Sequence, residues 1–536
     1  MRLTSTLTVA CISLKSAWPT VCRRFHHEFR RPSPLRFGSL HLALTALLLA
    51  PLAAIHAADS PKPAAYDEPY RPQFHFTPPT GWLNDPVGMF YHEGEYHIHY
   101  LGAPDKPGGW GYGWNHYLSK DMVTWQPLAD SVAGDKKTSI GGGSVVVDLK
   151  NTSGLQSGEE KPLVLFWNTM SSIPSDGFVG GPWRAEQKIW RTHSTDHGRT
   201  WHADEKPLLA PTDGNLDFRD PSVFWHEATQ RWIMLICRGY HDFSDVMASS
   251  DLKTWKLVGK ASNGEEPRLL QLPVRGTSEM KWAFLGGDYP MSPPQLGGKY
   301  VIGDFDGKNF IPESGARRLG GNHFVGSSFS NLPGGRQIWM GWKWLRDEGA
   351  PGPWTGGPLT LPVELCLDRD LEGQMVLHYA PVKELQSLRQ QPISLRNQTV
   401  GENCSLLTEK GIKGELFEVI AEFEIGKAKE FGIEFGKGPG GSFKIGYEVS
   451  GKKLTLRDPK GTELLSQLLL AKRGCVKLHV LLDRSMLDVF GNDGITWNCA
   501  FFKPENPKQQ GIELYAKGGT AKLMSLELWP LKSIWK

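Results

Sequence analysis

SKDMVTW, residues 119–125, is the stretch that decides the fold, because STDHGRTW (194–201) and SSDLKTW (249–255) repeat its pattern. Each stretch has Ser-x-Asp, two or three further residues and then Thr-Trp. The aspartate is expected to cap a tight turn through backbone N–H groups, and the tryptophan to pack between neighbouring units. Such a turn every 55 to 75 residues is typical of a β-propeller with one four-stranded blade per repeat, so about 300 residues predict roughly five blades.

The segments between these turns are expected to be short strands. From about residue 74 to 370, apolar or alternating runs such as PLVLFWN and RWIMLICR are separated by turn residues, and helical periodicity is nearly absent. From about residue 395, segments such as GELFEVIAEFEI and KLTLRD alternate apolar and polar residues between glycine turns. This pattern is typical of a half-buried antiparallel sheet and predicts a β-sandwich. Within it, GNDG (491–494) indicates a hairpin turn.

The domain organisation follows from these patterns. We expect an all-β chain with a five-bladed β-propeller at residues 74–380, a linker at 381–394 and a C-terminal β-sandwich at 395–536. Residues 1–58 hold several arginines, then an apolar run interrupted by proline, then small residues, which is the order of a signal peptide. Residues 59–73 are expected to be a linker. The chain is therefore predicted to be exported, either secreted or periplasmic, and not anchored in a membrane.

The basic charge of the chain resides in the predicted leader. The leader holds seven of the 60 lysines and arginines but only one of the 57 acidic residues, so its removal changes the formal net charge from +3 to −3. This balance gives no indication of nucleic acid or an anionic membrane as a partner. The oligomeric state is left open by the sequence.

No metal or cofactor is expected. The five cysteines outside the leader are odd in number and lack CxxC spacing, which indicates neither a disulfide framework nor a zinc site, with one pair at most. His97 and His99 alternate within a predicted strand and so share a face. No third ligand accompanies these two histidines, so a surface or packing role is expected for them rather than a metal pair.

Three acidic residues of the predicted propeller share an unusual setting. Asp85 lies in NDPVG, Asp220 in FRDPSVF and Glu265 in EEPRLL, and each is followed, at once or one residue later, by proline and an apolar run. Proline pushes the residue before it into an extended conformation, which would aim the acid. The acids are 135 and 45 residues apart and so fall on different blades. Because the first strand of each blade lines the axis, we expect the three carboxylates to meet in one axial pocket.

Paired carboxylates are what the cleavage of a glycosidic bond requires. One attacks the anomeric carbon, and another, protonated near neutral pH, gives a proton to the leaving oxygen. Burial and nearby carboxylates raise the pKa of a carboxyl group, whereas Arg219 beside Asp220 is expected to keep that aspartate ionised. Glu265 is then the expected proton donor, with Glu266 as a competitor for the role.

Six stretches follow one another along the chain: GWLNDPVG, FRDP, EEPRLLQLPV, GDFDG, GWKW and LLDRSMLDVFGNDG. Together, and in this order, they resemble glycoside hydrolase family 32, the β-fructofuranosidases, which include invertases, levanases and inulinases. The resemblance extends from about residue 74 to the C-terminus and implies a five-bladed propeller and a retaining mechanism. It implies that Asp85 is the nucleophile, that Asp220 stabilises the transition state and that Glu265 is the acid/base.

The same resemblance extends to substrate-binding positions. Asn84, Arg219 and Trp110 match positions that contact the fructosyl unit in the family. Several other tryptophans are candidates for stacking on sugar rings: Trp114, Trp183 and Trp342. The chain departs from the family pattern at four further positions, where polar residues or a cysteine are usual: Val87, Leu101, Glu266 and Val363.

Three functions remain open from the sequence. The first is an exported glycosidase that cleaves β-fructofuranosidic bonds in levan, inulin or sucrose. The second is a propeller glycosidase for another furanoside, such as an arabinofuranoside, because Val87 and Leu101 remove polar groups that would bind a sugar. The third is a non-catalytic fructan-binding protein with an altered pocket. In each case the partner is an oligo- or polysaccharide.

Overall fold

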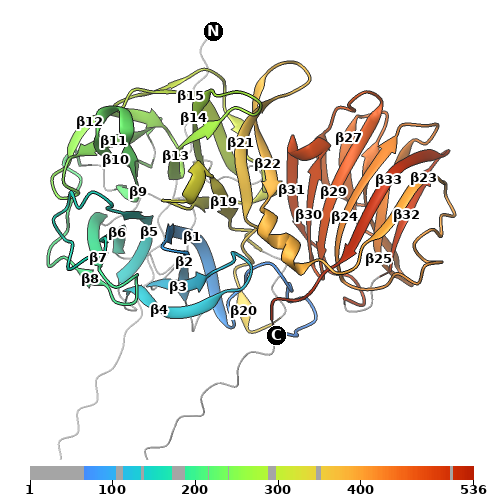
Figure 1. Ribbon diagram of the computed structural model, residues 1–536, viewed down its shortest axis with the longest axis horizontal. Helices are drawn as coiled ribbons and strands as arrows, with labels where there is room; N and C mark the ends of the chain where they lie inside the picture. The colour runs from blue at the N-terminus through green and yellow to red at the C-terminus, as the bar shows by residue number, and fades with distance from the viewer. Residues whose placement is uncertain are drawn as a thin grey trace, which may run out of the picture. The chain divides into compact units, whose positions relative to one another are not determined.

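Strands make up almost all of the regular structure in the computed structural model (Figure 1). The structure describes residues 66–103, 113–134, 138–171, 187–214, 217–239, 241–287, 297–345, 352–507 and 511–535. The predicted leader 1–58, Trp110 and Trp183 lie outside these residues. Within the described part, helical structure is limited to short 3-10 turns: η1 (Glu227–Thr229), η2 (Gly320–Asn322), η3 (Pro333–Gly335), η4 (Lys383–Leu388) and η5 (Asn492–Gly494).

Five sheets of the described chain surround one axis, as in the left part of Figure 1, and form the predicted propeller. Blade I has the order β20 (Trp354–Thr355), β1 (Gly81–His92), β2 (Glu95–Ala103), β3 (Gly113–Ser119), β4 (Gln126–Ala133). Blade II has β5 (Thr138–Val147), β6 (Leu163–Ser171), β7 (Lys188–Ser194), β8 (His202–Ala203). Blade III has β9 (Arg219–His226), β10 (Arg231–Cys237), β11 (Phe243–Ser249), β12 (Lys256–Ser262).

The last two blades complete the ring. Blade IV has β13 (Glu265–Pro273), β14 (Met280–Gly287), β15 (Gly298–Phe305), β16 (Phe310–Pro312), and β17 (Arg317–Arg318) also pairs with β15. Blade V has β18 (Gly326–Ser328), β19 (Ile338–Gly341), β21 (Val363–Arg369), β22 (Met375–Pro381). Apart from the parallel pair of β1 and β20, neighbouring strands within each blade are antiparallel.

The repeated aspartate forms the turn that the sequence predicts. Asp121 Oδ1 accepts hydrogen bonds from the N–H groups of Val123 (2.9 Å) and Thr124 (2.7 Å) between β3 and β4. Asp196 and Asp251 accept equivalent bonds between β7 and β8 and between β11 and β12. Two of the three tryptophans pack between blades, as expected, because Trp201 meets rings of blade I and Trp255 meets a ring of blade II. Trp125 instead meets Phe76, which precedes β1.

The same turn also occurs in the two blades where the sequence pattern is not visible. Asp306 Oδ1 accepts bonds from the N–H groups of Lys308 and Asn309 at 2.7 Å between β15 and β16. Asp370 Oδ1 accepts bonds from Glu372 (3.0 Å) and Gln374 (2.8 Å) between β21 and β22. An aspartate therefore caps the hairpin between the third and fourth strand of each described blade.

Two further sheets face each other as the predicted β-sandwich, at the right of Figure 1. One has the order β23 (Ile393–Val400), β33 (Ala521–Pro530), β24 (Leu416–Glu424), β29 (Cys475–Asp483), β30 (Met486–Gly491), β31 (Thr496–Phe501). The other has β28 (Glu463–Leu468), β27 (Lys453–Arg457), β26 (Gly441–Glu448), β25 (Glu430–Gly438), β32 (Ile512–Lys517). GNDG forms the expected hairpin, since β30 and β31 pair up to Gly491 and Thr496.

The propeller and the sandwich share a buried contact. Phe490 and Trp497 of the sandwich belong to the same apolar core as Tyr379 of blade V, and the Tyr379 and Trp497 rings are 5.6 Å apart. Next to this core, His75 lies between two carboxylates of the sandwich, with Nδ1 2.7 Å from Asp483 and Nε2 2.7 Å from Asp488. All three side chains are fully buried.

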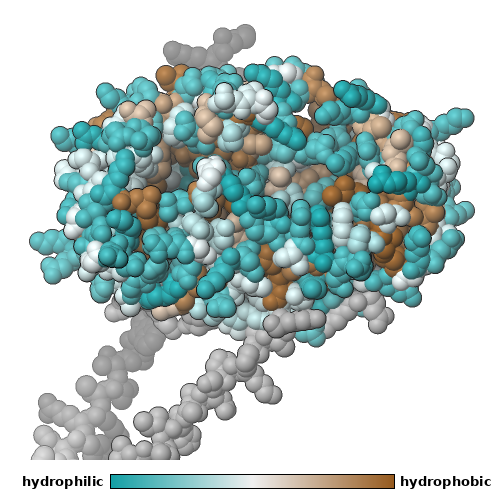
Figure 2. Space-filling model, viewed as in Figure 1, coloured by the Kyte–Doolittle hydropathy of each residue, from teal (hydrophilic) through white to brown (hydrophobic). Residues whose placement is uncertain are grey.

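The surface of the protein is mostly hydrophilic on the face shown in Figure 2. Figure 2 shows hydrophilic side chains over most of one face, with apolar ones in scattered groups. The five cysteines outside the leader are free: Cys237, Cys366, Cys404, Cys475 and Cys499. No helix in the described part of the chain is long and apolar enough to cross a bilayer.

Candidate active site

The three acids predicted from the sequence lie at the starts of axial strands. β1, β5, β9, β13 and β18 are the first strands of their blades and lie side by side around the axis. Asp85 lies in the first half of β1, Asp220 is the second residue of β9 and Glu265 is the first residue of β13. Because each acid lies near the beginning of its strand, the three are brought to one end of the axis.

Arg219 connects two of these acids. Its Nη2 lies 3.1 Å from Glu265 Oε1, and its Nε lies 3.2 Å from Asp220 Oδ2. Asp217 forms a further ion pair with the same guanidinium group. The backbone N–H of Glu266 donates to Asp220 Oδ2 at 3.3 Å. These contacts bring β9 and β13 together through charged side chains rather than through a ladder of backbone hydrogen bonds.

We define the axial acid cluster as five carboxyl groups and two guanidinium groups: Asp85, Asp217, Asp220, Glu265, Glu266, Arg219 and Arg268. If every member were charged, the carboxylates would outnumber the guanidinium groups. Three buried oxygens accept no hydrogen bond within the described structure: Asp85 Oδ1, Glu265 Oε2 and Glu266 Oε1. A buried excess of negative charge favours protonation, and unpaired buried oxygens are available to a ligand.

Two members of the cluster have a left-handed backbone. The φ angle is 56° at Asp220 and 48° at Glu266, whereas Asp85 has no positive φ. The expectation that the residue before proline is extended is therefore wrong at Asp220 and Glu266. Both lie where β9 or β13 has an irregular register with its neighbouring strand, and such bulges re-aim side chains. A left-handed non-glycine residue costs about 1–2 kcal/mol, and such strain is concentrated at functional sites.

Burial raises the pKa values of the three predicted acids and of Glu266, and it brings that of Glu265 near neutrality. Burial, opposed by Arg219 but assisted by Asp220 and Asp217, raises the pKa of Glu265 to about 7. Burial and the neighbouring Glu265 and Asp220 raise the pKa of Asp85 well above its ordinary value. A carboxyl group with a pKa near 7 can both give and take a proton at neutral pH. Glu265 therefore has the property required of an acid/base group.

The expectation that Arg219 keeps Asp220 ionised needs correction. The guanidinium group does contact Asp220 and lowers its pKa, but burial has the larger effect, so the pKa of Asp220 is raised overall. Arg219 is shared among three carboxylates, including Asp217, which reduces what it contributes to any one of them.

Glu266 is held differently from Glu265. Its Oε2 accepts a hydrogen bond from Arg268 Nη2 at 2.8 Å, and its side chain is almost completely buried, whereas 14% of the Glu265 side chain is exposed. Burial and Asp220 raise the pKa of Glu266 well above its ordinary value. Gly142 of β5 makes room for it, because a Cβ at that position would lie 1.5 Å from Glu266 Oε1. Glu265 is therefore the more accessible of the two glutamates.

The other predicted positions fall into three groups. Asn84 is buried beside Asp85, and its Oδ1 accepts the Asp85 N–H at 2.6 Å. Val87 and Leu101 are buried in one apolar cluster with Trp114, and Val363 is buried in the core of blade V. These departures from the family pattern are thus accommodated by apolar packing. Trp110 lies outside the described residues, so its contacts are not part of the described site.

Two tryptophans that the sequence suggested as sugar-stacking residues, and the two alternating histidines, pack in the interior instead. Trp114 is buried and donates its Nε1–H to Gly141 O at 2.9 Å, and Trp342 packs with Trp344. His97 and His99 are also buried, so of the surface and packing roles that the sequence left open they take the packing role. His99 Nδ1 contacts Gly88 O at 2.9 Å, and burial lowers the pKa of His97 to about 2.

Three members of the site were not identified from the sequence. Asp217 precedes Arg219 by two residues and pairs with it, and Arg268 lies two residues after Glu266 and pairs with that side chain. An acid two residues from an arginine is a local signal that could have found each pair. Asn168 of β6, whose Oδ1 accepts the Asp220 N–H at 3.0 Å, has no such signal because it comes from another blade.

A cavity of about 470 Å³ also opens along the axis. Residues from β1, β5, β9, β13 and β18 line it, including Arg268, but Asp85, Asp220 and Glu265 do not. The cavity is therefore distinct from the end of the axis where the acids meet.

Comparison with known proteins gives the same division of the chain. The family model for the "Glycosyl hydrolases family 32 N-terminal domain" matches residues 75–379, and the model for "Glycosyl hydrolases family 32 C terminal" matches residues 384–530. A levanase of Bacillus subtilis (strain 168) is 36% identical over 523 residues, which cover 91% of this chain and 74% of the levanase.

Two further comparisons concern inulinases. An extracellular exo-inulinase of Aspergillus awamori is 27% identical over 524 residues, covering 88% of this chain and 96% of the inulinase. The crystal structure of an exo-inulinase from Aspergillus awamori superposes with a TM-score of 0.77 at 26% identity, covering 88% of this chain and 100% of that chain. The similarity thus includes both the propeller and the sandwich.

Proposed function

The chain belongs to glycosyl hydrolase family 32 and is a glycosidase that hydrolyses β-fructofuranosidic bonds, and from this premise we propose which residues perform the reaction. Asp85 is the nucleophile, Glu265 is the acid/base and Asp220 stabilises the transition state. The observation that carries this proposal is the meeting of the three acids at one end of the axis, where Asp85 and Glu265 each have an oxygen without a hydrogen-bond partner among the described residues.

The proposed reaction has two displacements. In the first, Asp85 attacks the anomeric carbon of the fructosyl unit while Glu265 donates its proton to the leaving oxygen. In the second, Glu265 accepts a proton from water, which attacks the fructosyl–enzyme ester and releases Asp85 with retention of configuration. Positive charge develops on the sugar in both transition states, and the Asp220 carboxylate stabilises it. Arg219 pairs with this carboxylate, and Asn168 Oδ1 accepts the backbone N–H of Asp220.

Arg219 and Asn84 are proposed to bind the fructosyl unit. Arg219 is already directed into the site by Asp217, and its guanidinium group reaches Asp220 and Glu265. Asn84 is fixed next to the nucleophile by its hydrogen bond to the Asp85 N–H. Trp110 is retained as a third binding residue on the family resemblance alone.

We propose fructan, with levan first, as the substrate of an exported enzyme. The relative named levanase is 36% identical, and the Aspergillus awamori exo-inulinase that is 27% identical is named extracellular. The arabinofuranoside alternative is weakened because Val87 and Leu101, the departures that motivated it, are buried with Trp114 in an apolar cluster.

Product analysis tests the substrate proposal. The purified protein is incubated with levan, inulin, sucrose and an aryl arabinofuranoside, and the products are separated by chromatography. Fructose release from levan at the highest rate is expected. Release of arabinose at a comparable rate would support the other furanosidase, and binding of levan without any fructose release would support the non-catalytic protein.

A pair of matched substitutions tests the proton donor. Glu265→Gln is expected to slow hydrolysis of fructans by about 10²–10⁴-fold, and much less for an aryl fructoside, because a good leaving group needs little protonation. Glu266→Gln is the matched control and is expected to leave the ratio of the fructan rate to the aryl fructoside rate as in wild type. Wild-type activity in Glu265→Gln would assign the proton donor to Glu266 instead.

A further inference from the structure

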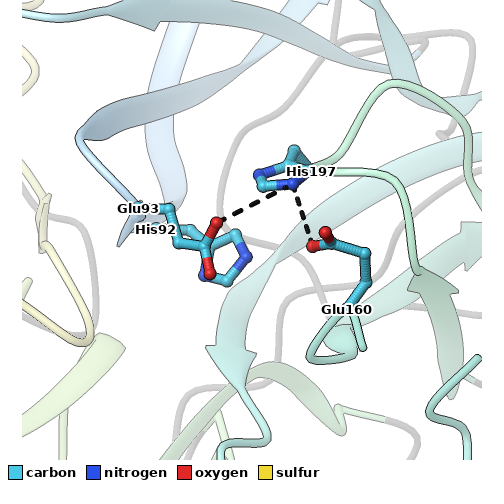
Figure 3. Close-up of side chains that lie close together, drawn as sticks. All are labelled: His92, Glu93, Glu160 and His197. Carbon is cyan, nitrogen blue, oxygen red and sulfur yellow. Dashed lines mark ion pairs between the residues drawn. The ribbon is translucent and has the colours of Figure 1, made fainter. Parts of the chain in front are cut away.

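A second group of ionisable side chains lies at the other end of β1 (Figure 3). His92 is the last residue of β1 and Glu93 follows it in the turn to β2. Glu160 comes from the connection between β5 and β6, and His197 from the turn between β7 and β8. The four side chains therefore lie between blade I and blade II. Measured along β1, the group is roughly 20 Å from Asp85.

The four side chains are close enough to share one ion. His197 Nε2 lies 2.9 Å from Glu160 Oε2 and 3.9 Å from Glu93 Oε2. One ligand atom from each of the four residues lies within 4.8 Å of every other. In a tetrahedral zinc site with bonds of about 2.0–2.1 Å, neighbouring ligand atoms are about 3.3 Å apart. Closing the site therefore requires small rotations, and Glu93, Glu160 and His197 are exposed enough to make them.

His92 is the residue that ordinary packing does not explain. It is 2% exposed, and its Nε2 is buried without a hydrogen-bond partner in the described structure. An unpaired buried imidazole nitrogen costs stability. The His92 and His197 rings lie 5.0 Å apart, and a ring nitrogen of His92 belongs to the same group as the His197–Glu160 pair. An ion pair between His197 and Glu160 alone would leave His92 unsatisfied.

The repeated turn of the propeller provides an internal comparison. In blades I, II and III the residue after the capping aspartate has a positive φ: Met122 (58°), His197 (58°) and Leu252 (56°). Met122 and Leu252 are apolar and almost fully buried, at 1% and 0% exposure. Blade II has a histidine at this position, directed toward Glu160 and away from an apolar core. The turn itself therefore does not require a histidine.

An ion pair next to this group also links blade I to blade II. Arg199, two residues after His197, donates to the Glu95 carboxylate at 2.8 and 2.9 Å and to His197 O at 2.6 Å. The turn that carries His197 is thereby fixed against the β1–β2 hairpin that carries His92 and Glu93. The ligand positions are held before any ion binds, which reduces the entropy that binding would cost.

We propose that His92, Glu93, Glu160 and His197 form a structural zinc site that clamps blade I to blade II. Two imidazoles and two carboxylates are a ligand set for zinc or a similar transition metal, whereas calcium and magnesium prefer oxygen ligands alone. The two carboxylates neutralise the charge of the ion. Four protein ligands leave no open position, so the site stabilises the fold and takes no part in the hydrolysis.

Zinc titration of the full chain tests the proposal. Untagged protein, freed of metal by a chelator, is titrated with zinc chloride by isothermal calorimetry and melted with and without zinc. One zinc ion per chain is expected, together with a rise in melting temperature of about 2 °C or more. Cobalt in place of zinc is expected to give the visible absorption bands of a tetrahedral site.

Exposed ligands supply variants that fold. His197→Gln and Glu160→Gln are each expected to weaken zinc binding by about 100-fold or more, and to leave fructose release unchanged because the site is remote from Asp85. Glu159→Gln is the matched control, since Glu159 is exposed and adjacent to Glu160 but outside the group. Zinc binding by wild type no stronger than by the two variants, or an equal loss in Glu159→Gln, would overturn the proposal.

Discussion

Two buried groups of charges in this protein are built in opposite ways. The interdomain histidine cluster, which is His75, Asp483 and Asp488, places one imidazole between two carboxylates. Asp483 also accepts the N–H groups of residues 73, 74 and 75, and Asp488 accepts the Trp497 Nε1–H at 2.7 Å, so each carboxylate oxygen has a partner. The axial acid cluster has more carboxyl groups than cations, and Asp85, Glu265 and Glu266 each have an oxygen that accepts no hydrogen bond from the described residues.

This difference shows how a structural network can be told from a reactive one. A buried network in which each group is satisfied rigidifies the fold, and the loss of one partner is strongly destabilising. A buried network with unpaired polar atoms and too few opposite charges costs stability. Shifted pKa values and left-handed residues in such a network are typical of functional sites. The axial cluster should therefore lose function without losing stability when it is altered, and the histidine cluster should do the reverse.

Asp85→Asn is expected to have the largest effect. Removal of the nucleophile should lower kcat on levan by about 10⁴-fold or more. The melting temperature should be unchanged or higher, because the substitution removes a carboxyl group whose pKa is raised by burial and by Glu265 and Asp220. Steady-state kinetics and circular dichroism melting measure the two effects. Asp304→Asn, at an exposed position of β15, is the control and should change neither.

Asp488→Asn should give the opposite result. It leaves His75 Nε2 without its carboxylate in a fully buried place, and breaking such a pair costs about 3 kcal/mol of unfolding free energy. The kcat of the folded fraction should remain that of wild type. Chemical denaturation measures the loss, and Asp493→Asn on the following turn, which breaks the exposed pair with Lys477, should cost less than about 1 kcal/mol. Equal losses in the two variants would remove the distinction between the clusters.

The pH dependence of activity sharpens the comparison. Glu265 must be protonated to give its proton, and its pKa is raised to about 7, so kcat/KM should fall as the pH rises through about 7. Asp217 raises this pKa, and its loss also frees Arg219 to act on Glu265, so Asp217→Asn should move the alkaline limb to lower pH. Asp488→Asn should leave the limb in place. A limb that moves to higher pH in Asp217→Asn would contradict the assignment.

The parts of this structure that the sequence predicts are those with a local signal. The Asp121, Asp196 and Asp251 turns depend on neighbouring residues, and the pattern of short strands between them predicts both the propeller and the sandwich. The turns at Asp306 and Asp370 use the same hydrogen bonds without the flanking Ser and Thr-Trp, so their sequence does not reveal them. Backbone hydrogen bonding, not the full motif, is what defines the turn.

Within the site, the motifs of an acid followed by proline predict the three acids, but they predict neither the backbone conformation of these acids nor the residues that contact them. The left-handed φ of Asp220 and Glu266 results from bulges in pairing with other strands, which nothing in a local stretch specifies. Asn168 reaches Asp220 from another blade. The histidine cluster is the extreme case, because His75 and Asp483 are 408 residues apart in the chain. Contacts of this kind depend on the whole fold and have no signature in a window of sequence.

The smallest expected effect is the pH dependence of stability that the histidine cluster adds. Burial disfavours charge on His75, but Asp483 and Asp488 outweigh it and raise the pKa of this imidazole well above its ordinary value. The folded state therefore keeps a proton that the unfolded chain loses above about pH 6.5. The stabilisation is complete below that pH and is lost as the pH rises toward the folded pKa, by about 1.4 kcal/mol per pH unit.

Carboxyl groups of the axial acid cluster with raised pKa values change stability in the same direction, so wild type alone does not isolate His75. The informative quantity is the difference in unfolding free energy between wild type and His75→Gln, measured by chemical denaturation at pH 6, 7 and 8. This difference should be largest at pH 6 and shrink as the pH rises, because only wild type has a proton to lose. A difference that is constant with pH would mean that folding leaves the pKa of His75 unchanged, and a difference that grows with pH would mean that His75 is neutral in the folded protein; either result would contradict a charged imidazole in the cluster.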